Sequence, residues 1–343
     1  MIQGMHVFLT KRKKRKASMD SPIFWQRADL LLPNPLDTIF FDLDGTLIKT
    51  VDSFHAADIA AAEFVAGTLN GLDWGQNEGR ALLTHDDILA FKQAGGYNND
   101  WDMCYLLAAL CTARLREWRG TPLAARSYSE WAALSHAANK EGRGGLAWVR
   151  EVVPASALPD YAMIGQIYRE LYWGAAELRK RYGQTARYLP DFPGYVRNEE
   201  PLCTPDFFRR LRHLGIRHLG IITGRIGPEV DIALEMLEEY SGERWWEVVI
   251  PADLAPKPDP RALRLALAGI AEPARAALYV GDTGDDLDVV LNYRAERGES
   301  EPPVLAVSLV YPTEVALYQQ RGADFVISHI DELVRCLGDG AIV

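Results

Sequence analysis

Short runs of apolar, strand-favouring residues recur along most of this chain, and stretches with a helical pattern separate the later runs. The apolar runs lie at residues 37–47, 219–222, 248–250, 277–280, 304–309 and 325–327. The helical stretches lie at residues 207–214, 228–240, 260–268, 285–297 and 313–321. Regular alternation of strand and helix predicts an α/β fold with a Rossmann-like, doubly wound and mostly parallel sheet that helices cover on both faces. Ligands of such folds bind beyond the carboxyl ends of the strands.

Residues 49–198 interrupt this alternation. The stretch is rich in Ala, Leu and Trp, and its apolar residues recur with a helical rather than a strand period. We expect helices at residues 56–69, 85–93, 101–118, 129–139 and 161–182, and loops at residues 142–145 and 154–159. The pattern therefore predicts an all-helical domain inserted into the α/β domain.

Chain length and charge exclude several classes of protein. The chain has 343 residues and a formal net charge of -10, and it is longer than the ~100–200 residues of a usual domain. Residues 1–18 contain six consecutive basic residues and no acidic one, and we expect them to form a disordered leader. The rest of the chain is acidic enough to repel a polyphosphate backbone, which excludes nucleic acid as the main partner.

Apolar runs and cysteines limit the location of the protein. No apolar run approaches the roughly 20 residues that cross a bilayer, and the first residues lack the apolar stretch of a secretion signal. The four cysteines are dispersed and lack the spacing of a zinc site or of a disulfide framework. We therefore expect a soluble cytoplasmic protein that does not bind membranes. The sequence leaves the oligomeric state open.

Two aspartates end the first apolar run. Asp42 and Asp44 are two positions apart, so their side chains point to one face of the sheet. An Asp-x-Asp pair alone is weak evidence, because it also occurs in turns. Three further polar segments follow later strands: Thr-Gly-Arg at 223–225, Lys-Pro at 257–258 and Gly-Asp-Thr-Gly-Asp-Asp at 281–286. Because parallel strands end at one edge of the sheet, we expect these segments to lie together.

These residue types fit phosphoryl transfer. Asp42 can attack phosphorus only if a cation offsets the repulsion between its carboxylate and the phosphate, and Asp282 and Asp286 are placed to hold that cation. Two like charges 4 Å apart repel by roughly 4 kcal/mol at an effective dielectric constant of about 20. A site of carboxylates and carbonyls without His or Cys favours a hard divalent ion, and Mg²⁺ fits best. Asp285 is an alternative to Asp286 as the second acid.

The other polar groups would bind the transferring and leaving oxygens. The hydroxyl of Thr223, the backbone amide at Gly224 and the ammonium of Lys257 would bind the transferring oxygens. Asp44 would protonate the leaving oxygen and later deprotonate the attacking water. Arg225 either contacts the substrate or pairs with a neighbouring carboxylate.

The four motifs, present in this order, resemble those of the haloacid-dehalogenase-like superfamily. The resemblance implies that Asp42 is the nucleophile of a phospho-aspartyl intermediate and that Asp44 is the general acid/base. Thr223 and Lys257 match the hydroxyl and the lysine of the second and third motifs. The implied Mg²⁺ ligands are Asp42, Asp282, Asp286 and the backbone carbonyl of Asp44.

One match and one insertion indicate the branch of this superfamily. Asp44 stands where dehalogenases proper and phosphonatase-like members have no aspartate, so the resemblance implies phosphate-ester chemistry. The insertion lies where phosphoglycolate-phosphatase-like and β-phosphoglucomutase-like members have a helical cap that closes over the substrate. Residues 49–198 would be this cap, and residues 19–48 with 199–343 would be the catalytic core. At about 150 residues, the insertion is larger than the usual cap of this type.

We therefore expect a Mg²⁺-dependent phosphatase, a phosphoric monoester hydrolase, that acts on a small phosphorylated metabolite. The leading alternative is an intramolecular phosphomutase, an isomerase that uses the same core. Phosphate release without a bisphosphate activator would distinguish the phosphatase from the mutase. A third alternative is a non-catalytic protein that binds a phosphorylated metabolite. The leaving group is open: a sugar phosphate, phosphoglycolate and a histidinol-phosphate-like amino alcohol phosphate all suit the same core.

A glycine-rich motif in the insertion is a candidate for specificity. The motif reads Gly-Gly-Tyr-Asn-Asn-Asp-Trp at residues 95–101. Tyr97, Asn98 and Asn99 could bind a polyhydroxylated leaving group by hydrogen bonds and aromatic stacking. Alternatively the motif is a turn in which Asn99 or Asp100 caps the helix that follows.

Overall fold

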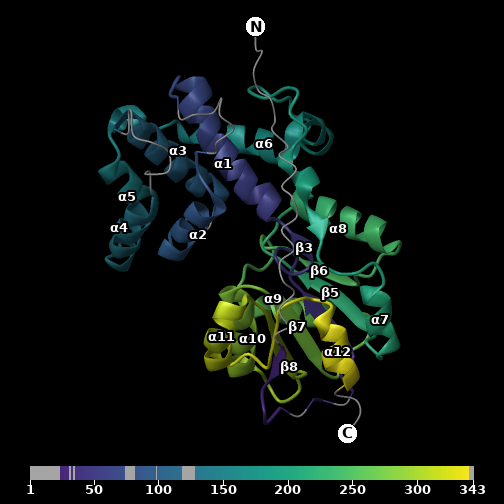
Figure 1. The fold of residues 1–343 in the computed structure, drawn as a ribbon. Helices are drawn as coiled ribbons and strands as arrows, with labels where there is room; N and C mark the ends of the chain where they lie inside the picture. The colour runs from purple at the N-terminus through teal and green to yellow at the C-terminus, as the bar shows by residue number, and fades with distance from the viewer. Residues whose placement is uncertain are drawn as a thin grey trace. The chain divides into compact units, whose positions relative to one another are not determined.

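The structure of this chain, a computed structural model, describes residues 24–30, 32–33, 35–73, 82–97, 99–117 and 128–339. The basic segment 1–18, expected to be a disordered leader, lies outside these residues. The described chain separates into two compact units (Figure 1). Residues 50–199 form the helical unit, and the described residues before 50 and after 199 form the sheet unit.

The strands of the sheet unit form one seven-stranded sheet in the order β1-β9-β8-β7-β2-β5-β6. All pairs are parallel except β1 with β9. The strands are β1 (Phe24–Gln26), β2 (Thr38–Phe41), β5 (His218–Ile222), β6 (Val248–Ile250), β7 (Ala277–Gly281), β8 (Val304–Leu309) and β9 (Phe325–Ile327). This confirms the predicted Rossmann-like, mostly parallel sheet. Strand β1 is an added edge strand that the sequence pattern does not predict.

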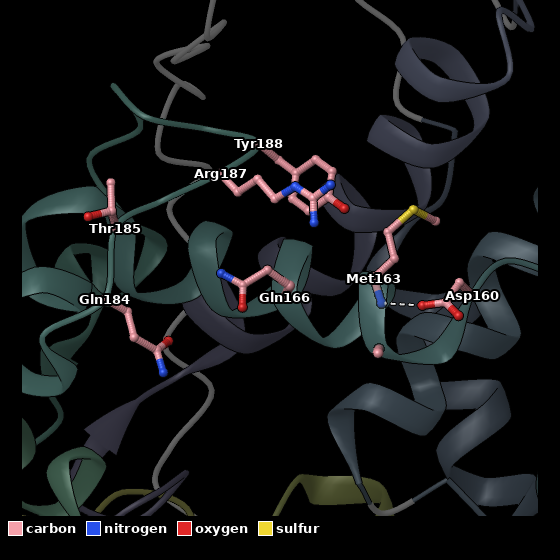
Figure 2. A pocket seen from close by; sticks show the side chains of 8 residues that line it. Asp160, Met163, Gln166, Gln184, Thr185, Arg187 and Tyr188 are labelled. Carbon is pink, nitrogen blue, oxygen red and sulfur yellow. Dashed lines mark hydrogen bonds between the residues drawn. The ribbon is translucent and has the colours of Figure 1, made fainter.

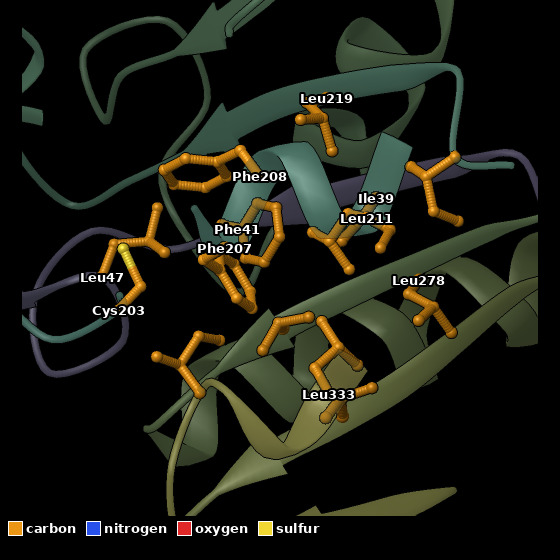
Figure 3. Close-up of a cluster of buried hydrophobic side chains, with 14 of the residues drawn as sticks. Ile39, Phe41, Leu47, Cys203, Phe207, Phe208, Leu211, Leu219, Leu278 and Leu333 are labelled. Carbon is orange, nitrogen blue, oxygen red and sulfur yellow. The ribbon is translucent and has the colours of Figure 1, made fainter. Parts of the chain in front are cut away.

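Helices pack against both faces of this sheet. The helices are α7 (Phe207–His213), α8 (Pro228–Ser241), α9 (Arg261–Gly269), α10 (Gly284–Glu296), α11 (Val315–Arg321) and α12 (Glu332–Asp339). Buried side chains of α7, α8 and α12 form one core cluster, and those of α9, α10 and α11 form another. Along β2, Ile39 and Phe41 belong to the first cluster (Figure 3). Phe40 belongs to the second cluster. This alternation follows from the two-residue period of a strand.

Local sequence explains where the helices next to the candidate site begin and end. Pro228 is at the first turn of α8, where its missing N–H is tolerated. Gly242 ends this helix in the left-handed region, at φ 79°. Thr283 caps α10, and a reciprocal pair of contacts with Asp286 forms a capping box.

A two-stranded ribbon lies at the two ends of the insertion. The strands β3 (Ile48–Lys49) and β4 (Glu200–Pro201) pair antiparallel, with Lys49 opposite Glu200. The residues that precede and follow the helical unit are therefore neighbours.

The helical unit contains the helices that the sequence predicts, together with one that it does not. They are α1 (Ala56–Glu63), α2 (His85–Ala94), α3 (Asp100–Glu117), α4 (Ser129–Lys140), α5 (Gly145–Val152) and α6 (Tyr161–Tyr182), with π-helical turns at Val51–His55 and Phe64–Leu69 and 3-10 turns at Ala155–Ala157 and Tyr195–Asn198. The sequence pattern does not predict α5. Helix α6 is kinked at Gly174, where the backbone of Pro193 and Gly194 packs against it. No helix in the described parts of the chain is long and apolar enough to span a membrane.

Candidate active site at the carboxyl end of the sheet

Three predicted acidic residues meet at the carboxyl end of the central strands. Asp42 follows β2 directly, and its backbone N–H donates to the carbonyl of Val280 on β7 at 2.9 Å. Asp42, Asp282 and Asp286 each have a carboxylate oxygen within 4.8 Å of the others. Parallel pairing of β2 with β7 explains this, because strands that run in one direction end at the same edge.

Lys257 joins this group from the loop after β6. Its ammonium nitrogen lies 2.9 Å from Oδ1 of Asp42 and 2.7 Å from Oδ1 of Asp286. All three side chains are almost completely buried. The site therefore places one buried ammonium among three carboxylates, which leaves an excess of negative charge.

Asp286 is held by more contacts than its neighbours. Oδ1 also accepts a hydrogen bond from the hydroxyl of Tyr279 at 2.7 Å, and Oδ2 accepts from the N–H and the hydroxyl of Thr283 at 3.0 and 2.6 Å. Both oxygens of Asp286 are thus engaged by protein groups. Asp285, the alternative second acid, is exposed on the first turn of α10.

Tyr279 and Thr283 are site residues that are not predicted from the sequence. Thr283 and Asp286 have the spacing of a capping box, so the sequence carried a signal for their contact. Tyr279 lies inside a buried strand, where an aromatic residue is indistinguishable from core by its pattern.

Asp282 has an oxygen with no hydrogen-bond partner. Its Oδ1 is buried and unpaired, and its Oδ2 packs against the backbone of Gly45. A buried carboxylate oxygen without a partner is costly unless a cation or a proton satisfies it. The oxygen-only donor set and this unpaired oxygen fit a hard divalent cation such as Mg²⁺.

The pKa shifts in the site agree with this excess of negative charge. Burial raises the pKa of Asp42 to about 7. Desolvation and repulsion from the carboxylates of Asp286 and Asp44 together outweigh the lowering of this pKa by the Lys257 ammonium. Burial and the neighbouring carboxylates of Asp42 and Asp286 raise the pKa of Asp282 well above its usual value. Burial alone would raise the pKa of Asp286, but Lys257 and the hydrogen bonds to its oxygens lower it. A bound divalent cation would favour the ionised form of these acids.

Arg225 pairs with a neighbouring carboxylate, one of the two interpretations that the sequence left open. Its Nε and Nη2 donate to Oδ1 of Asp44 at 2.8 and 2.6 Å. Thr223 is buried at the end of β5, and its hydroxyl oxygen accepts from the Arg225 backbone N–H at 3.1 Å. Gly224 has open space where a side chain would be.

The residues of the 95–101 motif make their contacts within the helical unit. Tyr97 is 1% exposed, and its hydroxyl lies 3.2 Å from Oγ of Ser135 and donates to the carbonyl of Gly145 at 3.3 Å. The side-chain oxygen of Asn99 accepts from the N–H of Trp101 at 2.8 Å, at the start of α3. Asn98 lies outside the described residues. The observed contacts of Tyr97 and Asn99 are those of a turn and a helix cap.

A separate pocket of about 490 Å³ in the helical unit contains none of the predicted site residues (Figure 2). It lies along the first half of α6 and the segment 184–188. Glu170, completely buried, accepts hydrogen bonds from the backbone N–H groups of Arg187, Tyr188 and Leu189. These bonds fix the segment that lines one side of the pocket.

We expect Gly45→Ala to reduce both stability and activity. Gly45 has φ +72°, and an added Cβ would lie 2.0 Å from Oδ2 of Asp282. A left-handed alanine costs roughly 1–2 kcal/mol, and the clash should also displace the Asp282 carboxylate. Urea unfolding and steady-state kinetics measure the two effects.

Gly242→Ala is the matched control for Gly45→Ala. Gly242 has a similar φ of +79°, but no atom lies within 4 Å of an added Cβ. This variant should lose similar backbone stability and keep its activity. Equal activity in both variants would contradict a role for the contact between Gly45 and Asp282.

We expect Tyr97→Phe to lower the melting temperature and to change kcat/KM equally for all substrates. The substitution leaves Ser135 and the Gly145 carbonyl without a buried partner, at a cost of about 1–3 kcal/mol. Tyr240→Phe, at an exposed tyrosine, should change neither quantity. A selective loss with a hydroxylated substrate relative to p-nitrophenyl phosphate, at unchanged melting temperature, would instead show that Tyr97 contacts the leaving group.

The chain is similar in sequence to a curated protein. A curated relative, an imidazoleglycerol-phosphate dehydratase of Phytophthora nicotianae, is 24% identical over 302 residues, which cover 87% of this chain. The chain spans 51% of that relative, about half of its length.

Two solved structures share the fold. The phosphatase Tt82 of Thermococcus thioreducens has a TM-score of 0.58 at 23% identity, with 88% of this chain and 99% of that chain covered. A structural genomics target has a TM-score of 0.57 at 18% identity, with coverage of 90% and 99%.

The family comparison covers all four motifs. Residues 36–290 match the hydrolase family described as haloacid dehalogenase-like hydrolase, which confirms the resemblance drawn from the sequence. The matched range contains Asp42 at one end and Asp286 at the other. The chain therefore belongs to the haloacid dehalogenase-like hydrolases.

Proposed function

We propose that this protein is a Mg²⁺-dependent phosphomonoester hydrolase of a small phosphorylated metabolite, acting in the cytoplasm through a phospho-aspartyl intermediate. The observation that carries the proposal is the buried Asp42 carboxylate, held 2.9 Å from the Lys257 ammonium beside Asp282 and Asp286. Membership of the family and the fold shared with a phosphatase support phosphoester hydrolysis as the general class of reaction.

In the first step, an oxygen of Asp42 attacks phosphorus and the bond from phosphorus to the leaving oxygen breaks. Asp44 gives a proton to that leaving oxygen. In the second step, water attacks the phospho-aspartate and gives a proton to Asp44, which releases phosphate and restores the Asp42 carboxylate. Lys257, fixed between Asp42 and Asp286, offsets charge on the transferring oxygens, and the Thr223 hydroxyl and the Gly224 amide would bind the same oxygens.

Asp42 and Asp282 are the acids best suited to hold Mg²⁺, together with the backbone carbonyl of Asp44 that the family resemblance implies. Asp282 has an unpaired buried oxygen. Asp286 borders the same site, but its oxygens already accept from Lys257, Tyr279 and Thr283, so its main role would be to orient the lysine. Mg²⁺ when bound would supply the positive charge that lets an ionised carboxylate approach a phosphate dianion.

The leaving group is to be found by experiment. The name of the curated relative refers to a phosphorylated compound with an imidazole ring. We therefore propose a substrate panel that includes imidazole-bearing and amino-alcohol phosphates beside sugar phosphates and phosphoglycolate.

The test is a phosphate-release screen of the full chain over this panel and p-nitrophenyl phosphate, with Mg²⁺ or with EDTA. We expect release that requires Mg²⁺ and no bisphosphate activator. An isomerised product without free phosphate would indicate the mutase instead. Tight binding of a phosphoester without any turnover would indicate a binding protein.

A further inference from the structure

We propose that Arg225 is a positioning residue that holds Asp44 by one carboxylate oxygen and leaves the other oxygen to carry the transferred proton. The inference rests on the proposed function, in which Asp44 exchanges a proton with the leaving group and with water. Beyond that function, Arg225 has a role of its own, and the two oxygens of Asp44 have different roles.

The guanidinium of Arg225 is fixed on three sides. Nε and Nη2 both donate to Oδ1 of Asp44, at 2.8 and 2.6 Å. Nη1 donates to the carbonyl of Glu229 in the first turn of α8, at 3.2 Å. The backbone N–H of Arg225 donates to the hydroxyl oxygen of Thr223 at 3.1 Å. Arg225 thereby ties Asp44 to the end of β5 and the beginning of α8.

The two hydrogen bonds distinguish the oxygens of Asp44. A guanidinium has donors only, so an oxygen that faces two of its N–H groups cannot also carry a proton toward them. The transferred proton must therefore be carried by Oδ2. Because the proton position on a carboxyl group decides which atom it can reach, this arrangement orients the acid before the substrate arrives.

The side chains of Arg225 and Asp44 differ in their solvent exposure. The Arg225 side chain is 1% exposed, whereas that of Asp44 is 31% exposed. Asp44 can therefore meet a substrate or a water molecule, and Arg225 is covered. This difference favours action of Arg225 through Asp44 over direct contact with the phosphate.

The dependence of kcat/KM on the leaving group tests the role of Arg225, because a purely structural role would not change this dependence. Departure of p-nitrophenolate needs little protonation, whereas departure of phenolate or an alkoxide needs an acid. A variant with a misplaced Asp44 should lose roughly 10²-fold in kcat/KM for phenyl phosphate and for β-glycerol phosphate. It should lose less than about tenfold for p-nitrophenyl phosphate. With that substrate the second step becomes slow, so phosphorylated Asp42 should accumulate.

The experiment compares Arg225→Gln, Asp44→Asn and the double variant on these three substrates in Mg²⁺ buffer, with intact-protein mass spectrometry after a rapid quench. We expect both single variants to steepen the dependence on the leaving group and to accumulate phosphoenzyme. The double variant should be no slower than Asp44→Asn, because Arg225 acts through Asp44. If Arg225→Gln does not fold, Arg225→Lys, which keeps the charge, should show the same pattern at smaller amplitude.

Arg294→Gln is the matched control for loss of an arginine from a buried ion pair. Arg294 pairs with the completely buried Asp324, and its Nε donates to the carbonyl of Val304 at the start of β8. This position is at the opposite end of the sheet from the candidate site. We expect a lower melting temperature and equal rate changes for all three substrates.

Two results would overturn the role of Arg225. One is an equal loss with all three leaving groups, as in the control. The other is weaker inhibition by inorganic phosphate with an unchanged leaving-group dependence, which would indicate direct contact with phosphate. Failure of the proposed function is recognised separately, since it would leave the wild type without phosphate release or Asp42→Asn with activity.

Discussion

Asp42→Asn is expected to lower kcat by at least roughly 10³-fold while the protein stays folded. Asparagine keeps the shape of the side chain but removes the charge of the oxygen that we propose as the nucleophile. The fold should tolerate the change, because the ionised form of the buried Asp42 is already unfavourable. Desolvation and the Asp286 and Asp44 carboxylates raise its pKa to about 7, although the Lys257 ammonium lowers it. Phosphate release at saturating substrate and a thermal melt followed by circular dichroism measure the two quantities.

Asp285→Asn is the control for this substitution. Asp285 is exposed one residue before Asp286, so its loss should change neither activity nor melting temperature appreciably. If Asp42→Asn retained a tenth of the wild-type activity, the phospho-aspartyl mechanism would be ruled out. A large loss in Asp285→Asn would show that the second acid of the site is misassigned.

Lys257→Met is expected to reduce activity and stability together. The ammonium of Lys257 is the buried cation between Asp42 and Asp286, and removing one partner of a buried pair costs about 3–5 kcal/mol. Activity should fall by roughly 10²–10³-fold, because the charge that we propose to stabilise the transferring oxygens is lost.

The stability loss of Lys257→Met should grow with pH. An acid whose pKa is higher in the folded than in the unfolded protein lowers the free energy of unfolding as the pH rises between these two pKa values. For Asp42 this pH range runs from 3.8 to about 7. Without Lys257, which lowers the pKa of Asp42, this range extends to higher pH. Urea unfolding in EDTA should therefore show a larger deficit against wild type at pH 8 than at pH 5.

Lys140→Met, at an exposed lysine in the last turn of α4, should show no deficit at either pH. An equal deficit of Lys257→Met at both pH values would mean that the lysine contributes by packing rather than by charge.

The sheet was predictable because its strands are buried on both faces and read as unbroken apolar runs. The short edge strand β1 contains a tryptophan and a glutamine among only three residues, which is too few for a period to be read. Helix α5 begins at a glycine, a residue that predicts a loop in the absence of tertiary contacts.

The candidate site was predictable as far as it follows from strand ends. The sequence placed Asp42 and Asp282 at one edge because both follow apolar runs. It could not choose between Asp285 and Asp286, because that choice depends on how Thr283 starts α10. The close approach of Gly45 to Asp282 joins residues far apart in the chain, and no local pattern encodes it.

The 95–101 motif shows a second limit to the prediction of functional residues from the sequence. Residues that hydrogen-bond a ligand are also those that satisfy turns and helix starts. The sequence therefore could not distinguish substrate recognition from the contacts that Tyr97 and Asn99 make within the helical unit.

The ribbon of β3 and β4 brings the two ends of the insertion together. Because Lys49 and Glu200 are paired, the chain leaves the sheet unit and returns to it at the same place, independently of the residues between them. The entropy of closing such a loop grows only with the logarithm of its length. An insertion of a different size or composition can therefore be exchanged at this point while Asp42, before the ribbon, and Thr223, after it, keep their places. Such an arrangement would allow the helical unit to change while the groups that we propose for the chemistry stay constant.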